Sequence, residues 1–132
     1  MEECHQCPFL NSQNFNYFYK KKVLKNIEHI GIDVKNQNEY NELFAKLFGT
    51  DHYKIEKVES ENVSTSFFML GETKIELLEA TSPDSAIAKF IEKKGEGIHH
   101  IAYEVEDVHE EMKRLKTEGF ELINKEPKKG AD

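Results

Sequence analysis

Two histidines at matching positions of an internal repeat are the strongest candidates for chemistry in this chain. The strand-like segment 27–34, which reads IEHIGIDV, returns at 98–105 as IHHIAYEV, so that His29 and His100 each stand third in their copy. A stretch of about helix length and then a glycine follow both copies. Two such units related by a pseudo-twofold axis bring their imidazoles together, and paired imidazoles are the beginning of a metal site.

The residues beside these histidines favour a cavity over a packed wall. Side chains of a strand alternate between its two faces, so His29 shares a face with Ile27 and Gly31, away from the remaining apolar residues of its segment. Ala102 takes the place of Gly31 in the second copy. A small residue two places after each histidine leaves space above the imidazole.

The other four histidines are weaker candidates. By the same alternation, His99 points away from His100, so the two are not expected to bind one ion from one strand. We interpret His99 as a packing residue or as a hydrogen-bond donor behind the ligands. His5, His52 and His109 lie in an N-terminal leader, a turn and a helix surface, where a role in the site is not predicted.

A third ligand is predicted at Glu76, in the strand-like segment 73–78. A carboxylate among apolar strand residues is costly to bury unless it is paired or bound to a metal. The alternative is a half-exposed strand, in which Lys74 and Glu76 both face solvent. The repeat predicts a second carboxylate on the equivalent strand of the second unit, which the 132 residues do not contain.

Periodicity predicts an α+β fold of two paired β-α-β-β-β units, of which the second is apparently truncated. The helix of the first unit is expected to be capped by Asn36 or Asn38 and to end at Gly49, and a tight turn at Gly71 joins its last two strands. The expected strands of this unit are 27–34, 53–58, 63–70 and 73–78.

The second unit follows a linker helix that is predicted to begin at Ser82 or Asp84 and to end at Gly95. Its first strand, 98–105, precedes a helix capped by Asp107, and a further strand is predicted at 120–124. The predicted organisation is a disordered leader at 1–25 and one domain at 26–132, made of a first module (26–80), the linker helix (81–96) and an incomplete second module (97–132). Either the chain is truncated, which we favour, or a partner chain completes the sheet.

Composition limits the possible functions. A formal net charge of −7 argues against nucleic acid as a partner, and no apolar run approaches the roughly 20 residues that span a membrane. Cys4 and Cys7 lie too close together for a disulfide framework, so the expected compartment is the cytoplasm. With His5 they make at most half of a zinc site, since no second cluster completes it.

The two histidine strands and their paired units resemble the vicinal oxygen chelate (glyoxalase) superfamily. Within it, residues 26–132 resemble the methylmalonyl-CoA epimerase family. The likeness is carried by four segments: 27–31, 73–79, the run from 85–90 to 97–102, and 126–131.

This resemblance implies a homodimeric enzyme with an acyl-CoA substrate and a divalent metal ion, Co²⁺ first, with Mn²⁺, Zn²⁺ or Ni²⁺ as alternatives. The ligands would be His29, Glu76, His100 and a glutamate from a final strand, and two carboxylate bases would exchange the C2 proton of methylmalonyl-CoA through a metal-stabilised enolate. The final-strand glutamate is absent here. Thr65 stands where some members carry a catalytic glutamate, so the catalytic bases are not assigned.

Two other functions fit the same fold. One is a glyoxalase I-type lactoylglutathione lyase, which a substrate test separates from the epimerase. The other is a non-catalytic module that binds small molecules and needs no metal. Retention of both histidines and of Glu76 favours a metal enzyme over a binding module. No GxSxG, P-loop or GxGxxG pattern supports a nucleophile-elbow or nucleotide-binding function.

Overall fold

The structure is a computed structural model that describes residues 24–129. Its first half contains one complete βαβββ unit, and a strand and a helix that repeat the beginning of this unit follow a linker helix. The α+β fold predicted from the sequence is therefore confirmed. The elements are β1 (Leu24–Asp33), α2 (Gln37–Phe48), β2 (Lys54–Val58), the short 3₁₀ helix η1 (Glu59–Glu61), β3 (Val63–Leu70), β4 (Thr73–Ala80), α3 (Ala86–Lys94), β5 (Gly97–Val105) and α4 (Val108–Thr117).

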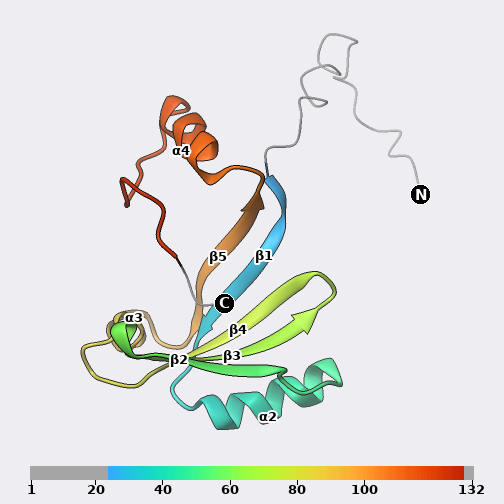
Figure 1. Ribbon diagram of the computed structural model, residues 1–132. Helices are drawn as coiled ribbons and strands as arrows, with labels where there is room; N and C mark the ends of the chain where they lie inside the picture. Colours follow the sequence, from blue (N-terminus) through green and yellow to red (C-terminus); the bar gives the residue numbers. More distant parts are fainter. Residues whose placement is uncertain (1–23, 130–132) are drawn as a thin grey trace, which may run out of the picture.

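The five strands form a single sheet in the order β2-β3-β4-β1-β5. Strands β1 and β4 are parallel, and the other three neighbouring pairs are antiparallel. Figure 1 shows α2 beneath the sheet, α3 beside it, and α4 at the far end of β5, well away from α2. One strand of the second unit, β5, thus extends the sheet of the first unit.

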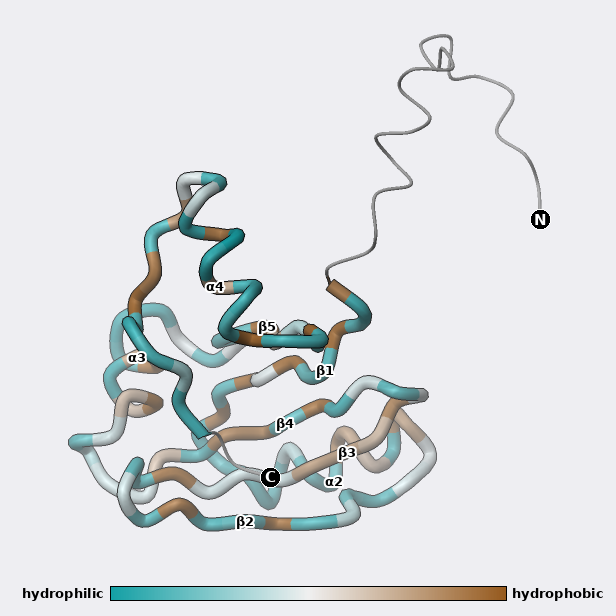
Figure 2. The backbone as a smooth tube through the Cα atoms, turned by 45° about the horizontal axis from the view of Figure 1, so that its top comes forward, coloured by the Kyte–Doolittle hydropathy of each residue, from teal (hydrophilic) through white to brown (hydrophobic). Residues whose placement is uncertain are grey.

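The main core lies between α2 and one face of the sheet. Helix α2 begins at Asn36, whose side chain accepts a hydrogen bond from the backbone N–H of Glu39, and ends at Gly49 with φ of 71°, a conformation that glycine adopts without strain. Figure 2 shows apolar stretches along the strands, whereas α4 is largely hydrophilic. The core residues are Val34, Phe68, Ile75 and Leu77, with Ile30, Ile32, Tyr40, Phe44 and Phe48 packed against them.

Gln37 ties the start of α2 to the sheet. Its buried amide donates to the backbone oxygens of Ser64 and Leu77, each over 3.0 Å, and accepts from the Ser64 hydroxyl over 2.8 Å. These bonds satisfy a side chain that would be costly to bury unpaired. Helix α2 is thereby fixed on one face, which leaves the opposite face of the sheet for the site.

Two local predictions in the second half of the chain were wrong. Helix α3 is capped by the buried Ser85, which accepts from the N–H of Ile87, whereas Ser82 bonds within the preceding turn to the N–H of Asp84. Residues 120–124 are described but form no strand. In the complete unit the equivalent strand, β2, pairs only with β3, so without such a neighbour a strand here has no hydrogen-bonding partner.

Most of the predicted leader lies outside the described residues. This includes Cys4, His5 and Cys7, whereas Leu24 and Lys25 already belong to β1. In the part of the chain that the structure describes, no helix is both long and apolar enough to cross a membrane.

Candidate metal centre

The two histidine strands lie side by side and pair symmetrically. Equivalent positions of the two copies are 71 residues apart. When each residue is replaced by its equivalent in the other copy, the pair His29–Ala102 becomes the pair His100–Gly31. A local two-fold axis therefore relates the two strands. The central pairs are His29 with Ala102, Ile30 with Ile101, and Gly31 with His100.

This symmetry brings the predicted ligands together. The Nε2 atoms of His29 and His100 are 2.9 Å apart, with the two rings perpendicular. Glu76 of β4 pairs with Gly31 and is buried, and one of its carboxylate oxygens is 3.6 Å from His29 Nδ1. One donor atom from each of His29, Glu76 and His100 lies within 4.8 Å of the others. All three side chains thus meet on the face opposite α2.

The surroundings of His100 favour its neutral form. Burial lowers the pKa of His100, and the neighbouring His29 and His99 lower it further. A neutral imidazole keeps a lone pair, which a metal requires. Two nitrogens bound to one tetrahedral ion are about 3.4 Å apart, given metal–nitrogen bonds of about 2.05 Å. The observed 2.9 Å would widen by only a few tenths of an ångström, so the donor set fits a divalent ion.

The predicted orientation of His99 was wrong. Its Nδ1 lies 2.9 Å from Nδ1 of His100, so both rings are on the same side of β5. Pairing with β1 jumps from His100 to Ile98, which leaves His99 as the extra residue of a bulge. A bulge interrupts strict alternation and re-aims the side chain.

A second bulge changes the face predicted for Ile27. Ile27 pairs with Tyr103 and His29 with Ala102, so Glu28 is the extra residue in β1. Because adjacent residues of β5 face opposite sides and paired residues share a side, Ile27 lies on the face opposite His29. The predicted sharing of a face by His29 and Gly31 holds, since both pair with alternate residues of β5.

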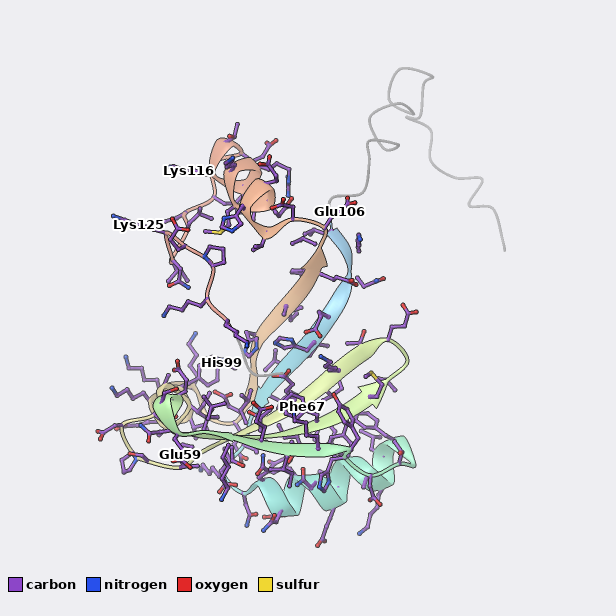
Figure 3. The ribbon with its side chains drawn as sticks, in the orientation of Figure 1. Glu59, Phe67, His99, Glu106, Lys116 and Lys125 are labelled. Carbon is purple, nitrogen blue, oxygen red and sulfur yellow. The ribbon has the colours of Figure 1, made fainter. Side chains whose placement is uncertain are left out.

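The cluster opens into a cavity of about 450 Å³. Strands β1 to β5, the start of α3 and the C-terminal segment contribute to its wall. Figure 3 shows His99 near the start of β5, between α3 and the C-terminal segment. Polar side chains on the wall are those of His29, Glu56, Ser60, Glu61, Thr65, Glu76, Ser85, His99, His100 and Lys129.

Glu56 is a site residue that the sequence reasoning missed. It pairs with Thr65 across β2 and β3, and therefore presents its carboxylate on the cavity face. Lys54 forms an ion pair with it over 2.6 Å. Thr65 itself is fully buried and offers no carboxylate, as predicted. Alternation along segment 53–58 indicated that Glu56 lies on one of the two faces of a strand. Only the pairing with β3 shows that this face lines the cavity.

The geometry defines a class of protein: a βαβββ unit whose sheet carries two histidines and a glutamate in a cavity on the face away from its helix. Residues 28–132 match the family model described as the Glyoxalase/Bleomycin resistance protein/Dioxygenase superfamily. The chain belongs to this superfamily.

Within the superfamily, the chain is similar to methylmalonyl-CoA epimerases. It is 37% identical over 106 residues to the mitochondrial enzyme of Dictyostelium discoideum, covering 80% of this chain and 64% of that protein. It is 34% identical over 111 residues to the ethylmalonyl-CoA/methylmalonyl-CoA epimerase of Cereibacter sphaeroides, covering 83% of each. A structure of a Streptomyces coelicolor methylmalonyl-CoA epimerase variant bound to 2-nitronate-propionyl-CoA superimposes with a TM-score of 0.75, at 30% identity over 82% of this chain and 79% of that one. The chain thus spans just under two thirds of the Dictyostelium protein.

Proposed function

We propose that this protein is an epimerase that interconverts the two configurations at C2 of methylmalonyl-CoA. The observation that carries the proposal is the meeting of His29, Glu76 and His100 in one cavity, in a chain whose relatives include several epimerases of this name. The acyl-CoA complex of the Streptomyces enzyme supports the same substrate class.

The three clustered side chains are the proposed metal ligands. His29 and His100 would each offer Nε2, since these two atoms face each other over 2.9 Å, and Glu76 would offer a carboxylate oxygen. Held by these residues, a divalent ion would supply positive charge to stabilise negative charge on the thioester oxygen, a contribution of several kcal/mol. Co²⁺ is the first candidate, followed by Mn²⁺, Zn²⁺ and Ni²⁺. A fourth, carboxylate ligand remains part of the prediction.

Glu56 is the proposed base. Epimerisation requires that the C2 proton leave and that a proton return to the opposite face of the planar enolate. Glu56 reaches the cavity from β2, whereas the metal ligands reach it from β1, β4 and β5. A carboxylate at this position can accept the proton while Lys54 stabilises its charge. Lys129, also on the cavity wall, is suited to pair with the free carboxylate of the substrate.

The homodimer and the cytoplasmic location stay predictions, as does the absence of a nucleic-acid partner.

The decisive experiment measures solvent deuterium entering C2 of methylmalonyl-CoA in the presence of Co²⁺. The protein should incorporate deuterium, a His100→Ala variant should not, and a His109→Ala variant, altered on the exposed surface of α4, should behave as the unmodified protein. Turnover of methylglyoxal with glutathione without deuterium incorporation would instead assign the lactoylglutathione lyase function. Activity in neither assay would contradict an enzymatic role for the chain.

A further inference from the structure

The two bulges occupy equivalent positions of the repeat. Glu28 in β1 and His99 in β5 are each the unpaired residue of a bulge, and each directly precedes a predicted ligand. Like the ligands themselves, they are 71 positions apart, so the local two-fold axis relates them. Two copies that share a bulge at the same place indicate that the bulge serves the site, since a bulge in a strand re-aims a side chain.

Both bulge residues contact Nδ1 of the histidine that follows them, the ring nitrogen that is not the proposed ligand atom. Glu28 forms a hydrogen bond with His29 Nδ1, and His99 Nδ1 is 2.9 Å from His100 Nδ1. A further side chain holds each bulge residue in place. Lys74 forms an ion pair with Glu28 over 2.8 Å, and the His99 ring packs edge-to-face on Phe90 with centroids 4.8 Å apart.

We propose that Glu28 and His99 are positioning residues that determine which ring nitrogen of His29 and of His100 carries the proton. Lys74 Nζ lies 2.8 Å from one oxygen of Glu28, and an ion pair of this geometry requires the carboxylate form of Glu28. A carboxylate only accepts hydrogen bonds, so His29 donates to Glu28 from Nδ1 and keeps a lone pair on Nε2.

The remaining contacts then have one direction. The Nε2 lone pair of His29 accepts from Nε2–H of His100 over 2.9 Å, which leaves Nδ1 of His100 as an acceptor. His99 therefore donates to His100 from its own Nδ1. When all three imidazoles are neutral, His99 donates to His100, His100 donates to His29, and His29 donates to Glu28.

This arrangement deepens the proposed function and rests on it for its consequence. To hold a metal ion, His29 and His100 would each have to present a lone pair on Nε2, so the His100 proton would have to move from Nε2 to Nδ1. His100 would then donate from Nδ1 to Nδ1 of His99, which can accept when its own proton is on Nε2. Each of these two rings changes its tautomer, and neither gains or loses a proton. His29 already has the tautomer that a ligand needs, because Glu28 holds it.

The test reads tautomers directly in the full chain labelled with ¹⁵N-histidine. Two-bond ¹H–¹⁵N correlations are recorded without metal at about pH 8, above the ordinary imidazole pKa of about 6.5. We expect the proton on Nδ1 of His29, on Nε2 of His100 and on Nδ1 of His99. Added Zn²⁺ should move the His100 and His99 protons and leave that of His29. A His29 proton on Nε2, or an even mixture in His29 and His100, would overturn the proposal.

Matched variants separate positioning from folding. Glu28→Gln and His99→Asn keep a group that can make the hydrogen bond and should preserve the tautomers, whereas Glu28→Leu and His99→Phe should leave mixtures. Both disruptive variants should weaken Zn²⁺ binding about 10- to 100-fold, as expected for residues behind a ligand. His109→Phe is the control and should change nothing.

The same data distinguish the two proposals. Expected tautomers that do not respond to Zn²⁺ would contradict the metal site and leave the positioning roles standing. Tight Zn²⁺ binding by every variant, with mixed tautomers throughout, would contradict the positioning roles and leave the metal site standing.

Discussion

Gly31 lies directly opposite His100 in the pairing of β1 with β5, and the imidazole occupies the space where a side chain at position 31 would be. A Cβ added there would lie 2.7 Å from His100 Nδ1 and 2.9 Å from its Nε2. Both distances are too short for real contacts, so the His100 ring has its position because residue 31 has no side chain. Gly31 was expected to leave space above His29 of its own strand, whereas the space beside it is occupied by His100 of the paired strand.

Gly31→Val should therefore displace the His100 ring. Overpacking of this kind typically costs 1–3 kcal/mol, and we expect about that loss in the free energy of unfolding, together with loss of Co²⁺ binding. Ile32→Val, on the opposite face, is the control: its unfolding cost should be about 0.5–1.5 kcal/mol with Co²⁺ binding intact. Urea unfolding and Co²⁺ absorption spectra measure both effects. Unchanged Co²⁺ binding in Gly31→Val would show that His100 does not need this space.

Removing either imidazole should abolish metal-dependent activity. His29→Ala and His100→Ala should each weaken Co²⁺ binding by more than the 10- to 100-fold typical of residues behind a ligand. Glu76→Gln should have a milder effect, because its amide oxygen still offers a ligand. Metal titration followed by equilibrium dialysis gives the affinities. Full exchange activity in His100→Ala after chelator treatment would exclude its role as a ligand.

Glu56→Gln should slow C2 deuterium exchange about 100- to 10,000-fold, the usual contribution of a general base. Metal affinity should stay unchanged, because Glu56 lies outside the three-residue cluster. Glu59→Gln, on the exposed 3₁₀ helix next to β2, serves as the matched control and should retain the exchange rate. If both variants exchange equally fast, the base is another residue.

Asp33 should make stability fall as pH rises. It is fully buried, neither carboxylate oxygen has a hydrogen-bond partner in the described part of the chain, and burial raises its pKa to about 6, although the charge of His99 opposes the rise. The folded state therefore binds more protons than the unfolded chain between about pH 4 and pH 6, and the free energy of unfolding decreases across this window.

Asp33→Asn removes this ionisation. The variant should be more stable than the unmodified protein by about 1–3 kcal/mol near pH 7, with the difference shrinking towards pH 4. Urea unfolding at several pH values measures it, with the exposed Asp84→Asn as a control. A difference that is independent of pH would mean that Asp33 does not ionise in this window.

The sequence was sufficient to predict the α+β fold, the capping of α4 by Asp107, and the meeting of His29, Glu76 and His100. For α2 it offered Asn36 and Asn38 as caps, of which Asn36 is the observed one. The caps and the strand faces depend on local propensity and on side-chain period, which are readable along one segment at a time. The meeting of the three residues was inferred from the repeat and from a carboxylate within an apolar strand.

Pairing between strands decided the bulges, the face of His99 and the place of Glu56. The bulges at Glu28 and His99 exist only between β1 and β5, because an extra residue is defined by the strand that it fails to pair with. For the same reason the sequence predicted His99 on the wrong face and predicted a strand at 120–124 for which the described residues provide no neighbour. The place of Glu56 in the cavity likewise follows from its pairing with Thr65, a contact between strands that no single segment encodes.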